Sequence, residues 1–238
     1  MRRILQFTIA CLLLSLTASL PLPAGEVIDG VVASVNRQPI LLSDWQEAIA
    51  FEAFMQQKPQ DAMSKADRLL ALQHLIDREL LKREMGDPGY MAPSDEVLAR
   101  DVAQLRAQVP QGSDDVSWRQ LLAGYGLNEN LLREHLRTQF QVMNFVEVRL
   151  RPNVHVNDEE IDSYYRNQLL ADLRSNGAAA VPLAEVKSRI RELLTQQRID
   201  ELLDAWLHNL RQQEDIHSSI SIPGVNTAAE APGVAGGN

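Results

Sequence analysis

The stretch that decides the fold is VVASVNRQPILLSD, residues 31–44. It reads as a short strand, a turn, a second strand and the start of a helix. Because an isolated two-stranded hairpin is only marginally stable in water, another part of the chain must cover it. The other strand-like run is Ile216–Ile222, close to the far end of the sequence. We therefore predict a fold in which the end of the chain returns to its beginning.

The region between these two runs has the composition and the start signals of helices. Leu, Ala, Gln, Glu and Arg are abundant, and aromatic residues make up only 5 % of the 238 residues, which favours helix. Ser43, with Gln46, and Ser94, Asn128 and Asn157 are predicted caps. The predicted helices cover about 44–57, 64–85, 95–108, 116–123, 129–149, 158–165 (fading by 177) and 183–213. The fold class is thus mainly α, with a small antiparallel β-sheet formed by an N-terminal hairpin and a C-terminal strand.

The last predicted helix, 183–213, carries apolar residues on two sides. Those of 183–194 share one side and those of 199–210 lie on nearly the opposite side, with the change at Gln196-Gln197. One interpretation is a straight helix that first meets the segment 154–165 and then docks behind the hairpin. The alternative is a kink or break at the two glutamines.

The first 24 residues have the pattern of a cleaved export signal. Arg2-Arg3 is followed by the apolar run Ile4–Leu16 and by the small residue Ala24. The run is short for a membrane span, so we favour cleavage over an uncleaved anchor. We expect a signal peptide at 1–24, a folded core at 25–222 and a disordered tail at 223–238. The expected parts of the core are a hairpin with helices at 27–150, a connecting segment at 151–182, and a closing helix and strand at 183–222.

Charge and cysteine content exclude several kinds of site and partner. Cys11 lies within the expected signal and is the only cysteine, so we expect no disulfide and no thiol chemistry afterwards. Cleavage would remove two of 23 basic residues and none of 32 acidic ones, which changes the net charge from −9 to −11. A net charge this negative argues against a nucleic-acid partner and against tight adsorption to anionic lipid. We expect no stable membrane insertion after cleavage.

The sequence has no pattern that indicates catalysis. No two histidines have the i, i+4 spacing of a helical metal pair. The densest acidic cluster, Asp158–Asp162, lies in a predicted first turn, where the helix dipole already explains it. The chain has no nucleophile elbow, P-loop or dinucleotide fingerprint. We therefore expect no enzyme activity, no metal and no cofactor.

Apolar side chains on two predicted helices are candidates for an outward-facing surface. Phe51, Phe54 and Met55 spread around the first helix instead of forming one stripe, and on the helix 129–149 Phe145 falls off the apolar stripe that carries Met143. Thioethers suit a surface that accepts varied partners. The alternative for each of these residues is ordinary core packing.

Four stretches, in the same order and spacing, resemble the N-terminal domain of the SurA family of periplasmic chaperones. They are VASVNRQPILLSD (32–44), LIDRELL (75–81), YGL (125–127) and VHVNDEEIDSYY (154–165). Matching segments are similar to the PrsA-type foldases. The closing helix and strand also look like the family's C-terminal segment.

The chain departs from that family in one respect. In the family, the helix with the Tyr-Tyr pair usually leads into a parvulin-type prolyl isomerase domain. Here 166–182 separate Tyr165 from the closing helix, and these residues are too few for such a domain. The resemblance therefore implies the chaperone core alone, which holds extended, unfolded segments, commonly of outer-membrane β-barrel proteins.

The resulting hypothesis is an ATP-independent periplasmic holdase, that is, a chaperone that binds unfolded exported proteins without isomerising them. Its candidate client-binding residues are Phe51, Phe54, Met55, Met143 and Phe145. The alternative is a non-catalytic escort or structural subunit dedicated to one periplasmic or outer-membrane partner. An enzyme is a third reading, which turnover of a prolyl peptide would support.

Overall fold

The computed structural model describes residues 29–87 and 89–220. The expected signal peptide at 1–24 and the expected tail at 223–238 lie outside these residues. The elements are β1 (Val31–Val35), β2 (Gln38–Leu41), α2 (Leu42–Met55), α3 (Lys65–Met85), α4 (Asp95–Gln108), α5 (Asp115–Gly124), α6 (Glu129–Leu150), α7 (Asp158–Tyr164), α8 (Leu170–Ser175), α9 (Leu183–Gln213) and β3 (Ile216–Ser218). Short helical turns are η1 (Gln60–Ala62), η2 (Gly89–Met91), η3 (Pro110–Ser113), η4 (Arg151–Asn153) and the π-turn η5 (Tyr165–Leu169). The predicted mainly α fold with a small antiparallel sheet is confirmed.

The sheet joins the two ends of the described chain. Its strand order is β2-β1-β3, and both pairings are antiparallel. Asn36 and Arg37 form the hairpin turn with φ values of 49° and 68°, as a two-residue turn of this twist requires. The Asn36 N–H donates to the Asp215 carbonyl oxygen at 2.8 Å, and the Asp215 N–H donates to Asn36 Oδ1 at 3.1 Å. The hairpin is therefore held by the segment that follows α9.

The third strand is shorter than the sequence predicts. Of the predicted run Ile216–Ile222, only Ile216–Ser218 pairs with β1. The N–H of Ile220 donates to Ser218 Oγ at 3.2 Å and so does not belong to the ladder. Residues 221 and 222 lie outside the described part. The predicted return of the chain to its first strand is nevertheless confirmed.

Replacing His217 with Pro is expected to lower the free energy of unfolding by about 1–3 kcal/mol, the usual cost of a lost ladder bond that leaves a partly buried acceptor unpaired. His217 lies opposite Ser34, between the bonds Asn36 N–H to Asp215 O and Ser219 N–H to Val32 O. In an antiparallel ladder this makes Ser34 and His217 the hydrogen-bonded pair. Urea unfolding measures the effect, and His217→Ala is the control because it keeps the N–H. Equal stability of the two variants would contradict the ladder.

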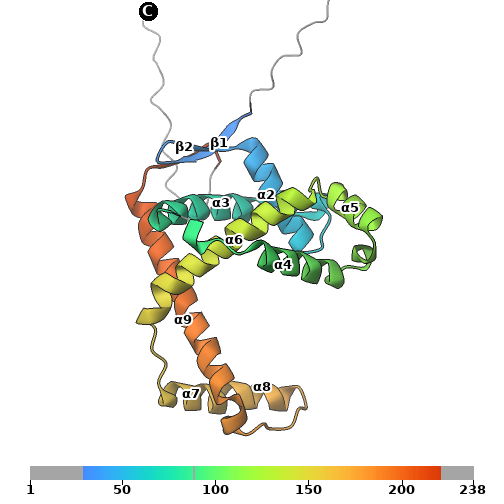
Figure 1. The fold of residues 1–238 in the computed structure, drawn as a ribbon. Coiled ribbons are helices and arrows are strands. Elements are labelled where there is room, and N and C mark those ends of the chain that lie inside the picture. Colours follow the sequence, from blue (N-terminus) through green and yellow to red (C-terminus); the bar gives the residue numbers. More distant parts are fainter. Residues whose placement is uncertain (1–28, 88, 221–238) are drawn as a thin grey trace, which may run out of the picture.

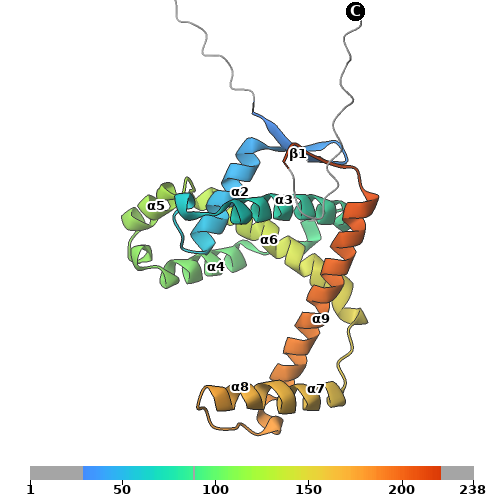
Figure 2. The same ribbon diagram turned by 180° about the vertical axis from the view of Figure 1, so that it is seen from behind.

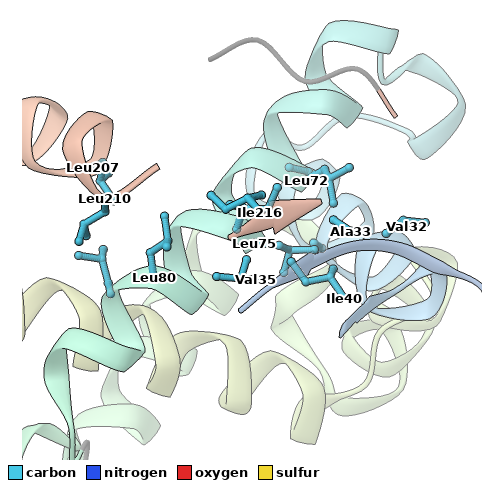
Figure 3. Close-up of a cluster of buried hydrophobic side chains, with 14 of the residues drawn as sticks. Val32, Ala33, Val35, Ile40, Leu72, Leu75, Leu80, Leu207, Leu210 and Ile216 are labelled. Atoms are coloured by element: carbon cyan, nitrogen blue, oxygen red, sulfur yellow. The ribbon is translucent and has the colours of Figure 1, made fainter. Parts of the chain in front are cut away.

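The main core lies between the sheet, α3 and the end of α9. Leu72, Leu75 and Leu80 of α3 belong to one buried cluster with Val35 of β1 and Ile216 of β3 (Figure 3). Leu207 and Leu210 of α9 are labelled in the same view and belong to the same buried cluster. A second cluster surrounds Trp118, which is 1 % exposed, and draws on α2, α4, α5 and α6.

The predicted caps are correct for three helices and wrong for the first. Ser94, Asn128 and Asn157 accept the expected backbone N–H bonds at the starts of α4, α6 and α7. Ser64, which was not predicted as a cap, does the same for α3. Helix α2 begins directly after β2, with Leu41 at the cap position, and the Asp44 carboxylate accepts the Leu41 N–H at 2.8 Å. Ser43 is therefore inside the first turn, and its N–H donates to Asp29 Oδ1 at 3.2 Å.

Helix α9 connects the two ends of the molecule. Its second half packs on α6 and α3, and its first half packs on α7, which lies with α8 far from the sheet (Figures 1 and 2). Ile190 is buried on one side and Ile199 on the other. The helix continues through Gln196-Gln197 and looks nearly straight in both views. The two-sided interpretation is confirmed, and a break at the glutamines is not present.

The segment between α7 and α9 is short and helical. It consists of η5, α8 and a connector, in which the Tyr165 hydroxyl donates to the Val181 carbonyl oxygen at 2.7 Å. Asp158 at the start of α7 receives hydrogen bonds from Lys187 and Arg191 of α9, each at 2.8 Å. These contacts fix α7 on α9, and no further domain is inserted between them.

Candidate functional site

A groove of about 530 Å³ lies between α2, α3, α6 and α9. Its walls are mostly apolar, with Phe51 from α2, Leu70 from α3, Met143 from α6 and Leu203 from α9. Leu70 is 48 % exposed and Met143 is 59 % exposed. Large apolar side chains this accessible and gathered at one depression form a surface that can bind apolar side chains of another molecule.

The structure separates the five candidate residues into three groups. Phe51 and Met143 line the groove. Met55 is 39 % exposed but lies at the end of α2, away from the groove. Phe54 and Phe145 are 4 % and 8 % exposed, so the interpretation of these two as an outward-facing surface is wrong.

The two buried phenylalanines have structural contacts. Phe54 meets the edges of Trp118 and Tyr125, with ring centroids 6.0 and 5.6 Å apart. The rings of Phe145 and Trp206 pack against each other, with centroids 5.8 Å apart. Apolar residues spread around α2 because this helix packs into two separate clusters, with Ile49 in the first and Phe54 in the second. A spread of apolar residues therefore indicated two cores and not one open face.

Two histidine–carboxylate pairs flank the groove. His74 Nδ1 lies 3.1 Å from Glu52 Oε1, and this hydrogen bond raises the pKa of His74 and lowers the pKa of Glu52. His135 Nε2 lies 2.8 Å from Glu47 Oε1, and its ring stacks on Phe51 with centroids 4.5 Å apart. Burial lowers the pKa of His135. Among the described residues no group of His, Asp or Glu side chains has an arrangement that could hold a metal ion.

An ion pair fixes α9 against the groove wall. Arg211 donates from Nε to Asp77 Oδ1 at 2.7 Å and from Nη2 to Asp77 Oδ2 at 2.5 Å. Both side chains are nearly buried, with 12 % and 11 % exposed. This pair could not be found by sequence reasoning, since nothing in either local sequence indicates a partner 134 residues away.

The comparisons with known proteins agree with this architecture. The model of the SurA-like N-terminal domain family matches residues 1–146. This chain belongs to that family. Chaperone SurA of Pectobacterium atrosepticum is 27 % identical over 196 residues, which cover 79 % of this chain and 43 % of that protein. The chain thus spans less than half the length of this curated relative.

The family match covers three of the four walls of the groove in this SurA-like chain. Helices α2 and α3 and most of α6 lie within residues 1–146, whereas α9 follows them. Across the described ranges, none of the helices combines the length and the apolar character that a bilayer crossing needs.

The His74–Glu52 pair is expected to stabilise the SurA-like fold only within a limited pH range. Because the pKa of His74 is raised, His74 gives its full stabilisation below its ordinary pKa, about 6.5. This stabilisation is lost as the pH rises through the pKa of the folded state. Because the pKa of Glu52 is lowered, its contribution is complete above about 4.3 and is lost as pH falls through the lower folded-state value. Between these limits His74→Gln should cost roughly a few tenths of a kcal/mol, as for other solvent-accessible pairs.

Melting curves of the wild type and His74→Gln at several pH values measure this difference. The gap in melting temperature should be largest near pH 5.5 (about midway between the two ordinary pKa values) and should close in mildly alkaline buffer. His135 is present in both proteins, so its own titration cancels in the comparison. A gap that grows with rising pH would contradict the pairing.

Proposed function

We propose that this chain is an ATP-independent chaperone that holds unfolded segments of exported proteins in the groove between α2, α3, α6 and α9. The observation that carries the proposal is the pair of accessible side chains Leu70 and Met143 on the walls of a groove in a SurA-like domain. An extended chain that buries its apolar side chains there is kept from aggregating by mass action, so no nucleotide is needed. The name of the relative, Chaperone SurA, supports the same role.

The proposed clients are outer-membrane β-barrel proteins before they fold. Their strands present apolar side chains at alternate positions and unpaired backbone groups, which a shallow groove can bind through many weak contacts. The flexible thioether of Met143 suits such varied partners. The signal-like sequence at 1–24 supports a periplasmic location, where such clients pass.

Prolyl isomerisation is not part of the proposed activity. The connection between α7 and α9 consists of η5, α8 and a short connector, so it holds no isomerase domain. Turnover of a prolyl peptide by the purified chain would overturn this part of the proposal.

Replacing Met143 with Ser is expected to raise the chaperone concentration needed for half-maximal suppression of aggregation by about tenfold. This factor corresponds to about 1.4 kcal/mol, a typical cost for losing one apolar side chain from a contact. The assay dilutes a urea-unfolded outer-membrane β-barrel protein into buffer and follows light scattering. Val148→Ser is the matched control, because Val148 is 62 % exposed on the same helix and does not line the groove.

The outcomes separate the proposal from its alternative. Equal loss in both variants, or no suppression by the wild type at stoichiometric excess, would count against the groove. A dedicated escort would instead retain one stoichiometric partner in a pull-down from periplasmic extract, whereas a general chaperone would retain many proteins.

A further inference from the structure

Arg78 places a cation in the groove wall. It lies on α3, and its Nε is buried with no hydrogen-bond acceptor. Within the described residues it makes no ion pair. The adjacent Asp77 pairs with Arg211, which binds both carboxylate oxygens.

The other acidic groups that act on Arg78 are already engaged. Three carboxylates, those of Glu79, Asp44 and Glu47, influence its pKa from a distance. The first pairs with Lys82 at 2.8 Å, the second accepts the Leu41 N–H, and the third pairs with His135. Burial, the largest influence, lowers the pKa of Arg78, but a guanidinium keeps its proton in proteins. The groove therefore contains a permanent, partly dehydrated positive charge.

Such a group gains most from an anionic acceptor. An unpaired donor in a dehydrated position is unfavourable, and a carboxylate removes that penalty with charge-assisted bonds. The guanidinium is planar and matches the two oxygens of a carboxylate. The chain carries a net charge of −9, and the guanidinium of Arg78 attracts a carboxylate locally in spite of it.

The groove continues past Arg78 in both directions along α3. Ala71 and Leu75 line it before Arg78, and Leu81 lines it afterwards. A bound chain can therefore extend on both sides of the cation, which favours an acidic side chain within a segment over a carboxylate at the end of one.

We propose that Arg78 binds the carboxylate of an Asp or Glu side chain within an extended, otherwise apolar client segment. This inference rests on the proposed function and adds a chemical preference to it. The flanking side chains Phe51, Leu70 and Met143 take the apolar neighbours of that acid. A client segment with one acid among alternating apolar residues therefore binds better than its neutral counterpart.

The test compares two short peptides of alternating Leu and Ser, acetylated and amidated, with a central Glu or Gln. Fluorescence anisotropy with the wild-type chain should show about tenfold tighter binding of the Glu peptide, the effect of one charge-assisted hydrogen bond. In Arg78→Met this preference should vanish, and in Arg78→Lys it should persist in part. Arg83→Met is the matched control, since Arg83 is an exposed arginine of the same helix outside the groove.

A stability measurement separates this role from a structural one. If Arg78 serves binding, then Arg78→Met should melt at the same temperature as the wild type or higher, because it removes an unpaired charge and keeps an apolar stem. A lower melting temperature would indicate a structural role and overturn the inference.

Each remaining outcome is decisive. Equal binding of both peptides by the wild type, or an unchanged preference in Arg78→Met, overturns the inference. Tight binding of the Gln peptide once its terminal amide is replaced by a free carboxylate would assign Arg78 to chain ends instead. If the wild type suppresses aggregation normally but shows no preference for the Glu peptide, only this inference is refuted. If it shows neither suppression nor preference, the proposed function is refuted as well.

Discussion

Replacing Asp77 with Ala is expected to lower the free energy of unfolding by about 3–5 kcal/mol, the cost of leaving a buried charge without its partner. The Asp77 carboxylate receives two hydrogen bonds from Arg211, at 2.7 and 2.5 Å. After its removal the guanidinium stays in a site where only 12 % of its side chain is exposed. Since this pair joins α3 to α9, the variant should unfold at much lower urea concentration than the wild type.

Two control variants make this measurement specific. The double variant Asp77→Leu with Arg211→Met should recover to within about 1 kcal/mol of the wild type, because an apolar pair of similar volume replaces the buried ions. Lys82→Ala removes a more exposed pair with Glu79 on the same helix, and should cost less than about 1 kcal/mol. A small effect of Asp77→Ala alone would contradict the burial of the pair.

Local signals were sufficient for most of the helices. Predicted α4, 95–108, and predicted α9, 183–213, have the bounds that the structure shows. Their starts depend on residues within one turn, such as Ser94, whose Oγ accepts the Val97 N–H. The predicted cap of α2 was wrong because this helix begins directly after β2. Leu41, and not Ser43, occupies the cap position, and the Asp44 carboxylate accepts the Leu41 N–H.

Contacts between distant segments were predictable only where strong patterning required them. A hairpin in need of cover and a single remaining strand-like run led to the pairing of β1 with β3. No pattern in the sequence predicted the Asp77–Arg211 pair, because charged residues on a helix usually face water.

The groove could be predicted only in part for the same reason. Met143 and Phe54 were both predicted to face outward, yet one is 59 % exposed and the other 4 %. The difference arises from Trp118 and Tyr125, which cover Phe54 from other parts of the chain. Leu70 was missed because nothing in the local sequence shows which apolar residues of α3 stay exposed.

Replacing Ile199 with Ala is expected to destabilise the chain by about 2–5 kcal/mol, the range for truncating a large aliphatic side chain in a tightly packed core. Ile199 is fully buried in the cluster that contains Leu72 and Ile216. From Ile199 onward, the apolar residues of α9 face the main core and no longer α7. Truncation of this side chain therefore weakens the contact that brings β3 to the hairpin.

Leu193→Ala is the matched control for this prediction. Leu193 lies less than two turns earlier on α9 and is 41 % exposed, so its truncation should change stability by no more than about 0.5 kcal/mol. Urea unfolding followed by tryptophan fluorescence measures both variants, because Trp206 lies on the same helix and contacts Phe145. If the two truncations cost the same, α9 does not divide its apolar residues between two neighbours, and the closing of the chain onto its first strand must be held elsewhere.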